Sequence, residues 1–463
     1  MESKGPERYL ALFLPWALAS VFASDPALSY LIAWVGSFFI FLLSLTGWVR
    51  PIPADLRFSD QLMRPLFVMQ IIFAGYMSCS SIFYFLNTLG YIDFEKANAG
   101  SVINGASLAM VAQCQRYYCL GHAALTTGIL LFMRYPQKKK YDVEGGKLSS
   151  LLMRVAFISY PASLVFIQIP GLSQFYYQFN ALSFIAGTLA LAFAIPLRQP
   201  VNTLICGLLY CFNLYSAFTS GFKEPIIISI IVLGVFLYPS YKKLVLITIG
   251  PLLLLCFMFL PTYVSTFRGA AWAEDADVDE SAQIALDATL NQDDSNWTFL
   301  VYRLSEIDMF AAFVQSTPAN VDYYGTQILA QSGIAVIPRI FWPEKPITEV
   351  LVMERVYAAE VVNRMSAASA KPAFIVDGYL SGGPVGIFLA LFIYGAVAQL
   401  ISVKAESLFG GYTLGSALIF SGLFQVFWRG LSFEFLINPV VWSYVSMLII
   451  HRILLAANIL KRV

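Results

Sequence analysis

Apolar runs long enough to cross a lipid bilayer recur along this 463-residue chain. About 20 apolar residues suffice for one helical crossing, and only helices or closed barrels satisfy all backbone hydrogen bonds inside a bilayer. The chain is 58% hydrophobic and 12% charged, whereas soluble domains carry about 25% charged residues. The first run lacks a signal-peptide cleavage pattern, so we expect it to be retained. We predict an all-α polytopic membrane protein with about twelve spans, at 9–24, 28–47, 66–89, 105–132, 149–169, 177–196, 201–219, 225–239, 244–263, 374–402, 411–428 and 433–456.

Lysine and arginine predict the orientation of these spans. With twelve crossings, the short loops on the side of the N-terminus carry most of the cations, and short cationic loops stay in the cytoplasm. We therefore expect both termini to be cytoplasmic. The cations concerned are Lys4, Arg8, Arg50, Arg57, Arg64, Arg134, Lys138, Lys139, Lys140, Lys147, Arg198, Lys242, Lys243, Lys404, Arg452, Lys461 and Arg462.

One long hydrophilic segment, residues 266–372, interrupts the spans. It divides the chain into 1–265 with nine spans, the segment itself, and 373–463 with three spans. Long loops translocate largely regardless of their charge, and the topology places this one on the exoplasmic face. In a Gram-negative bacterium that face is the periplasmic side of the inner membrane.

The first part of the hydrophilic segment, residues 273–296, is acidic and has few large apolar residues. Such a composition is typical of a solvated, mobile surface stretch. Calcium binding is the alternative, although the spacing of the carboxylates does not match an EF-hand.

The number and spacing of the cysteines and histidines do not predict a metal site. The six cysteines lie in or beside apolar runs, none forms a CxxC motif, and the chain has only two histidines, His122 and His451. A histidine-rich metal centre or a disulfide framework is therefore not expected. We expect no cofactor and no nucleic-acid partner.

The second part of the hydrophilic segment contains the stretch Ile337-Pro-Arg-Ile-Phe-Trp-Pro-Glu-Lys-Pro346. Arg339 and Lys345 stand among prolines and aromatic residues, a pattern too rigid for a linker and too charged for a buried span. Upstream, Arg303 and Glu306 stand three residues apart and would share a helix face, as a simple ion pair or as part of a site.

Further charges stand near the exoplasmic ends of the predicted spans, where ionisable residues are costly and usually functional. Lys223 and Glu224 lie between the helix breakers Gly221 and Pro225, either in a solvated turn or at the mouth of a cavity. Arg116 lies within an apolar run and either faces a polar interior or extends to the interface. Arg268 and Arg429 follow spans directly, as interfacial anchors or as site residues.

Together these cations predict an anionic ligand on the exoplasmic side. Guanidinium groups bind phosphate oxygens in pairs and stay charged in a low-dielectric site, so a lipid with a diphosphate headgroup fits. Aromatic side chains would stack on sugar faces. The candidates for this are Trp342, Tyr323, Tyr324 and Tyr379.

At these residues the chain resembles the Wzy-type oligosaccharide repeat-unit polymerases, which make O-antigen and exopolysaccharide. The resemblance rests on Ser220–Lys223, on the Arg303/Glu306 segment, on the Pro-Arg…Trp-Pro…Lys-Pro pattern of 337–346, and on the carboxylate and glycine-rich turn of 376–386. Two positions depart from the family pattern: Lys223 stands where relatives often have Arg, and Asp377 stands where Glu is common.

The resemblance implies a GT-C-like glycosyltransferase without a required metal. It would transfer a growing glycan from undecaprenyl diphosphate to a lipid-linked repeat unit, with a chain-length regulator protein as a possible partner. Arg339 and Arg303 would bind the diphosphate, supported by Arg268, Lys223 and Lys345, with Arg116, Arg429, Trp342 and Tyr379 as further substrate contacts. Glu306, Asp377 and Glu224 are the candidates for the catalytic base, and each could instead orient an arginine.

Two other functions stay open at this stage. An O-antigen-ligase-like transferase would use the same donor with another acceptor, but the hydrophilic segment lacks the histidine expected of a ligase. A flippase for lipid-linked sugars would be expected to show repeated helices and matching broken helices in two halves, and the sequence shows no such repeat.

Overall fold

The computed structural model describes residues 5–89, 107–136, 140–142, 148–169, 171–219, 224–271, 277–291, 305–365 and 370–463. The chain is mostly helical, which confirms the all-α prediction. The helices are α1 Glu7–Leu10, η1 Ala11–Phe13, α2 Leu14–Val21, α3 Pro26–Leu45, η2 Phe58–Gln61, α4 Pro65–Ile72, η3 Phe73–Cys79, α5 Ile82–Thr88, α6 Leu108–Phe132, α7 Leu148–Gln168, α8 Gln174–Ala194, α9 Pro200–Phe218, α10 Glu224–Ala271, α11 Val278–Asn291, α13 Ile307–Ser316, α14 Gln327–Val336, α15 Thr348–Ala358, α16 Phe374–Leu408, η6 Thr413–Phe420, α17 Ser421–Leu423, α18 Val426–Arg429 and α19 Phe433–Ala456. Two short strands, β1 Tyr141–Asp142 and β2 Lys461–Arg462, pair antiparallel.

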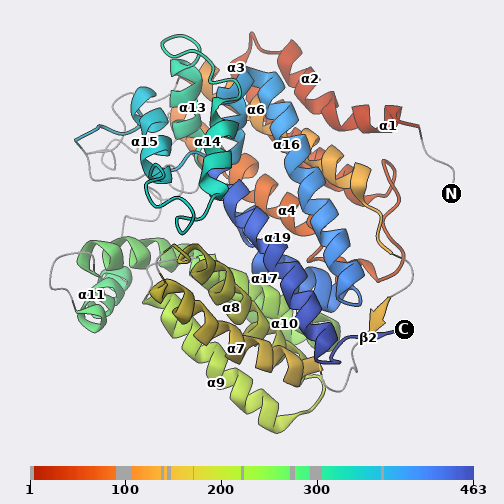
Figure 1. Cartoon of the computed structure of the whole chain (residues 1–463). Helices are drawn as coiled ribbons and strands as arrows, with labels where there is room; N and C mark the ends of the chain where they lie inside the picture. The colour runs from red at the N-terminus through yellow and green to blue at the C-terminus, as the bar shows by residue number, and fades with distance from the viewer. Residues whose placement is uncertain are drawn as a thin grey trace.

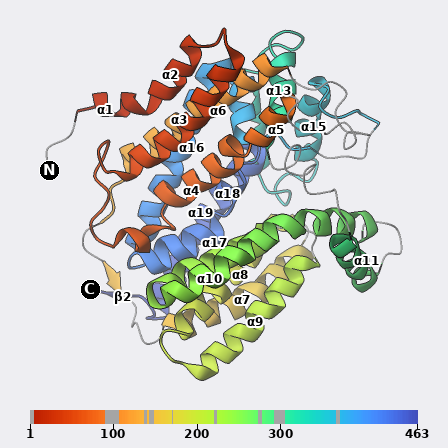
Figure 2. The same cartoon turned by 180° about the vertical axis from the view of Figure 1, so that it is seen from behind.

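Eight helices within the described ranges are long and apolar enough to cross a membrane. This supports a membrane-embedded protein, whereas the predicted count of twelve stays a prediction. Figure 1 shows α7, α8, α9 and α10 gathered on one side of the molecule, and Figure 2 shows the same grouping from behind. The other side contains α2, α3, α4, α6 and α16, and the short helices α13, α14 and α15 lie together at one end of it (Figure 1).

Two of the predicted spans begin at residue types that favour helix starts. The Asp25 side chain accepts a hydrogen bond from the backbone N–H of Leu28 at 3.1 Å, and Pro26 follows as the first helical residue. Ser107 caps α6 in the same way, accepting from the N–H of Met110. These caps use backbone donors that a helix start otherwise leaves unpaired.

The long helix α10 is two antiparallel arms and not one rod. Its backbone leaves the helical region at Tyr241, with φ −134° and ψ 45°. A Cβ added to Gly234 would lie 3.0 Å from Cγ2 of Ile249, and Ile230 packs in one apolar cluster with Leu260. Residues so far apart along a helix meet only if the chain folds back, which agrees with the separate runs predicted at 225–239 and 244–263.

The acidic stretch differs from the expectation of a mobile surface segment. Residues Val278–Asn291 form α11, which packs against α10. Ser281 and Ala285 are buried, and the Tyr215 hydroxyl of α9 donates to Asp279 Oδ1 at 3.1 Å. A buried small-residue face against α10 accounts for helix formation despite the acidic composition.

Small residues bring α6 and α16 into direct backbone contact. A Cβ added to Gly128 would collide with the carbonyl oxygen of Phe392, and one added to Gly395 would collide with that of Leu125. In a bilayer, where apolar burial between helices gains little, such close van der Waals packing holds helices together. This pair forms the centre of the larger helix group.

We predict that Gly395→Val separates α6 from α16 and lowers stability by about 1–3 kcal/mol or more, because the added side chain overpacks the contact. Gly207→Val is the matched control, since a Cβ at Gly207 of α9 meets nothing within 4 Å. Thermal unfolding in detergent measures both variants. Equal unfolding temperatures for the two would contradict this account of the packing.

Candidate functional site

The first two turns of α16 form the base of the candidate site. They begin where the Phe374 N–H donates to the Gly430 carbonyl at 2.7 Å, and they end at a break at Gly382 and Gly383. Gly383 has φ +63°, a backbone conformation that favours glycine, and a Cβ there would lie 3.0 Å from the Tyr323 hydroxyl. The break separates a short, buried helical segment from the long apolar part of α16.

A buried ionic triad joins this segment to two other helices. Arg355 of α15 donates from Nη1 to Glu434 Oε1 at 2.7 Å and from Nη2 to Glu434 Oε2 at 3.0 Å. Its Nη2 also lies 3.3 Å from Asp377 Oδ1, and the backbone N–H of Phe433 donates to Asp377 Oδ2 at 2.8 Å. The three side chains are 0–3% exposed. The triad therefore ties the hydrophilic segment to the starts of α16 and α19.

The triad holds one cation and two carboxylates. Burial alone would lower the pKa of Arg355, but the charge of Asp377 and the hydrogen bonds with Glu434 offset this effect and raise the pKa, so the guanidinium stays charged. Arg355 Nε and Ser432 Oγ are buried without a hydrogen-bond partner among the described residues. These two atoms leave part of the hydrogen-bonding capacity of the junction between α15, α16 and α19 unsatisfied.

Arg355 and Glu434 were not among the residues selected from the sequence. Arg355 lies in the stretch Thr348–Ala358, where its charge alternates with Glu349 and Glu354 as on a solvated helix. Glu434 stands two residues after Ser432, at the start of an apolar span. One feature of the sequence could have identified Glu434: it is the one carboxylate of the final predicted span, and ionisable residues inside spans usually have a structural or functional role.

We predict that Arg355→Leu lowers stability by about 3–5 kcal/mol, because it leaves two buried carboxylates without their cation. Adding Asp377→Asn and Glu434→Gln to the same chain should recover part of the loss. Arg364→Leu is the control, since its pair with Glu354 is exposed and such pairs contribute about 0–1 kcal/mol.

Thermal unfolding in detergent measures this series. If Arg355→Leu unfolds at the wild-type temperature, or if neutralising the carboxylates makes it less stable still, the triad does not hold the segment in place.

An aromatic cluster adjoins the triad along α16. Its centre is Tyr379, whose ring centroid lies 5.4 Å from that of Tyr117 on α6 and 5.9 Å from those of Phe310 and Tyr323. The Tyr379 hydroxyl donates to the Thr317 carbonyl at 2.7 Å, so this buried ring is fixed in place. Tyr323 is exposed and Tyr117 half-buried, which makes the outer rings of the cluster available to a ligand.

Arg116 precedes Tyr117 in α6 and is half-buried. Its Nη1 donates to Ser29 Oγ at 2.8 Å, and Ser29 in turn donates to the Ala19 carbonyl. Within the described ranges Arg116 is held by a hydroxyl group and by no carboxylate, so its charge is available to an anion beside the aromatic cluster.

The stretch 337–346 is a compact turn with internal hydrogen bonds. Arg339 is half-buried and donates from Nη1 to the Pro343 carbonyl at 3.2 Å. The buried Lys345 ammonium donates to the Ala335 and Ile337 carbonyls at 3.0 and 2.6 Å. Burial, and then the charge of Arg339, lower the pKa of Lys345. Lys345 thus shapes the turn, which leaves Arg339 as its more accessible cation.

The structure describes only some of the remaining predicted residues. Arg303 and Lys223 lie outside the described residues. Glu224 begins α10, and the half-buried Arg268 lies in its last turn. Glu306 occupies the N-cap position before the first helical residue of α13, Ile307, and its predicted pairing with Arg303 lies outside the described residues. Within the described ranges, no group of three or more histidine, cysteine or carboxylate side chains is arranged to hold a metal ion.

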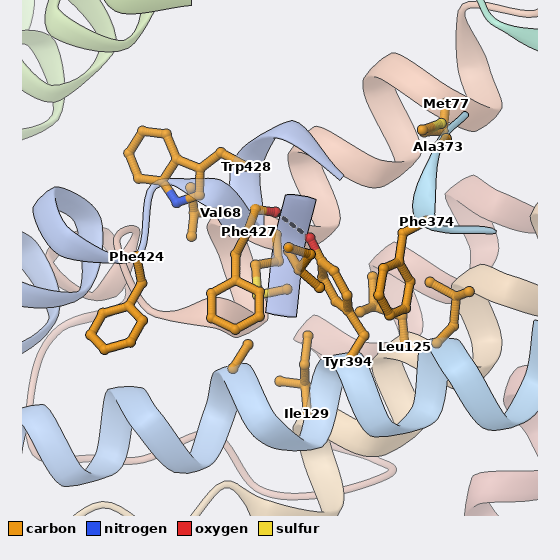
Figure 3. Close-up of a cluster of buried hydrophobic side chains, with 14 of the residues drawn as sticks. Val68, Met77, Leu125, Ile129, Ala373, Phe374, Tyr394, Phe424, Phe427 and Trp428 are labelled. Atoms are coloured by element: carbon orange, nitrogen blue, oxygen red, sulfur yellow. Dashed lines mark hydrogen bonds between the residues drawn. The ribbon is translucent and has the colours of Figure 1, made fainter. Parts of the chain in front are cut away.

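Arg429 is exposed at the edge of a small apolar cavity. The cavity, of about 30 Å³, lies between α4, η3, α6, α16 and α18. Figure 3 shows the aromatic side chains around it, with the Tyr394 hydroxyl donating to the Phe427 carbonyl at 2.6 Å. A space of this size and apolar character fits packing between helices and not a glycan.

A second ionic cluster closes the opposite end of α16. Arg64 is 1% exposed and donates from Nε and Nη2 to Glu406 at 2.9 and 2.7 Å. It also binds both oxygens of Asp55, at 2.9 and 2.6 Å, and its Cζ lies 3.8 Å from the Tyr135 ring centroid. Burial favours the neutral acid at Asp55, but the hydrogen bonds from Arg64 prevail and hold the pKa of Asp55 below 3.8.

We predict that the stability difference between wild type and Asp55→Asn depends on pH. A lowered folded-state pKa means that the contribution of Asp55 is complete above its ordinary value and disappears as the pH falls through the lowered one. The unfolding temperatures of the two proteins, measured in detergent from neutral to acidic pH, should converge at the acidic end. A difference that stays constant across the series would contradict the assignment.

Comparison with known families adds one finding. A family model described as Domain of unknown function (DUF8712) matches residues 14–462. No curated protein and no solved structure matches the chain. The matched range includes the apolar helices and the hydrophilic segment alike, so the two parts form one family unit.

Proposed function

The chain belongs to the DUF8712 family, and we propose that it is a membrane-embedded glycan polymerase. In this proposal it transfers a growing glycan from undecaprenyl diphosphate to a lipid-linked repeat unit at the outer leaflet of a bacterial inner membrane. The observation that carries the proposal is the aromatic cluster of Tyr117, Tyr323 and Tyr379 beside Arg116, at the end of the helices that the hydrophilic segment covers. Aromatic faces and guanidinium groups are the side chains that bind sugars and diphosphates.

The proposed topology has twelve spans, both termini in the cytoplasm and a GT-C-like arrangement. Dividing α10 at Tyr241 turns the eight long apolar helices into nine. Helix α6, the N-terminal pair α1–α2 and the run from η6 to α18 supply three more. An even number of crossings agrees with the cationic loops on the side of the termini.

In the proposed reaction, a hydroxyl oxygen of the acceptor sugar attacks the anomeric carbon of the donor glycan. The bond from that carbon to the diphosphate oxygen breaks, and undecaprenyl diphosphate leaves with the electron pair. Arg339, Arg303 and Arg116 would stabilise the charge that develops on the leaving oxygen. The proton of the acceptor hydroxyl passes to a carboxylate within hydrogen-bond reach.

The contacts of the three candidate carboxylates favour different roles. Asp377 is fully buried, and both of its oxygens are occupied by Arg355 and the Phe433 N–H. These contacts favour a positioning role for Asp377. Glu306, half-buried at the start of α13 beside Phe310, is the stronger candidate for the base, and Glu224 stays a candidate at the start of α10.

We predict that Arg339→Ala abolishes high-molecular-weight polymer in cells that depend on this protein, because it removes a diphosphate contact. Polymer is read on a glycan gel, with protein level checked by immunoblot. Arg339→Lys, which keeps the charge but loses the paired donors, should retain partial activity. Arg364→Ala, at an exposed arginine of the same hydrophilic segment, is the matched control.

The outcomes separate the alternatives. Single lipid-linked repeats at the outer leaflet support a polymerase, whereas accumulation at the inner leaflet would indicate a flippase. Polymer that forms but is not attached to its final acceptor would indicate a ligase. Normal polymer from a well-expressed Arg339→Ala variant would overturn the assignment of Arg339.

A further inference from the structure

The turn and helix that follow α14 expose an unusual amount of apolar surface. Phe341 is 77% exposed, Ile347 59%, Val350 53% and Ile340 51%. Trp342 adds an exposed indole. We call these five residues the apolar patch. Five large exposed apolar side chains within eleven residues of chain indicate a site of interaction.

The patch lies at the ends of membrane-spanning helices. Gly171, in the turn between α7 and α8, approaches the turn so closely that a Cβ there would lie 2.7 Å from the backbone nitrogen of Ile340. Trp442 of α19 donates from Nε1 to the Val336 carbonyl at 2.8 Å, and its ring packs on Phe175 of α8. Three candidate spans therefore support the base of the patch.

Exposed apolar residues of two candidate spans flank the Gly171 turn that approaches the patch. Ile167 and Ile169, at the end of α7, and Tyr177, near the start of α8, are exposed large apolar or aromatic side chains on either side of the Gly171 turn. Because these residues close two spans, they lie at the level where the hydrocarbon core gives way to lipid headgroups. The patch extends that band of apolar surface onto the hydrophilic segment.

Internal hydrogen bonds hold the patch in its exposed form. The Lys345 ammonium binds the Ala335 and Ile337 carbonyls, and Arg339 binds the Pro343 carbonyl. Both cations thereby donate to carbonyls of the turn or of the adjoining end of α14, and the backbone around them is restrained by prolines at 338, 343 and 346. The apolar side chains therefore project from a turn that hydrogen bonds and prolines hold rigid.

We propose that the apolar patch inserts into the headgroup–acyl boundary of the leaflet on its own side, so that the hydrophilic segment is a membrane-inserted element and not a loop in water. The partner is the lipid surface itself. Aromatic side chains favour this interfacial depth, where an apolar ring and a polar edge are both accommodated. Arg339, at the base of the turn, then faces the layer of lipid phosphates.

Photo-cross-linking tests this inference independently of any enzymatic activity. The photoreactive residue p-benzoylphenylalanine is incorporated at Phe341 in the full chain, in nanodiscs of phosphatidylethanolamine and phosphatidylglycerol. The matched control carries it at Met365, an apolar residue of the same segment that is 93% exposed. We expect a protein–phospholipid adduct at position 341 that exceeds the adduct at position 365 several-fold.

Two results would overturn the proposal. A lipid adduct at position 341 no greater than that at 365 would place the patch in water. A protein–protein adduct in place of the lipid adduct would make the patch an interface between copies of the chain.

A second measurement keeps the test valid if the photoreactive residue disturbs the turn. Wild type and Trp342→Phe are compared in vesicles containing lipids brominated close to the headgroup. If Trp342 lies near the lipid headgroups, the brominated lipids quench its fluorescence strongly. The tryptophan fluorescence that is lost in Trp342→Phe should therefore be a fraction that these lipids quench in the wild type. Removal of an unquenched fraction would contradict insertion.

Discussion

The structure depends on two buried arginines that fix the ends of one helix. Helix α16 carries Asp377 in its first turn and Glu406 in its last; Arg355 of the preceding helix α15 binds the first, and Arg64 from far upstream in the chain binds the second. Leaving either carboxylate without its cation in a low-dielectric environment is strongly unfavourable. The position of α16 is thus determined at both ends, and the Gly128 and Gly395 contacts with α6 determine it in between.

This fixed helix gives the candidate site its geometry. The break at Gly382 and Gly383 leaves a short helical segment whose one face contacts Arg355 and whose other face contributes Tyr379 to the aromatic cluster. Asp377 and Tyr379 are two residues apart, so the ionic and aromatic parts of the site are joined through the backbone of this segment.

Much of the membrane architecture could be predicted from the sequence, because hydropathy is a local property. The separate runs at 225–239 and 244–263 correspond to the two arms of α10, and the glycine-rich turn after Asp377 corresponds to the break in α16. The triad could not be predicted, because it joins α15, α16 and α19, and a single sequence does not show which distant charges meet. The role of Lys345 depends on the carbonyl positions in a folded turn, which residue type alone does not reveal.

The Arg355 triad also bears on how this protein can be divided. Its cation comes from the hydrophilic segment, while both of its anions come from the apolar helices that follow. Excising the segment would leave Asp377 and Glu434 buried among apolar side chains without a cation. Expressing the segment alone would leave the guanidinium of Arg355 without its two carboxylates. Neither half is a free-standing module, so an insertion, deletion or exchange that crosses this junction must carry all three residues together.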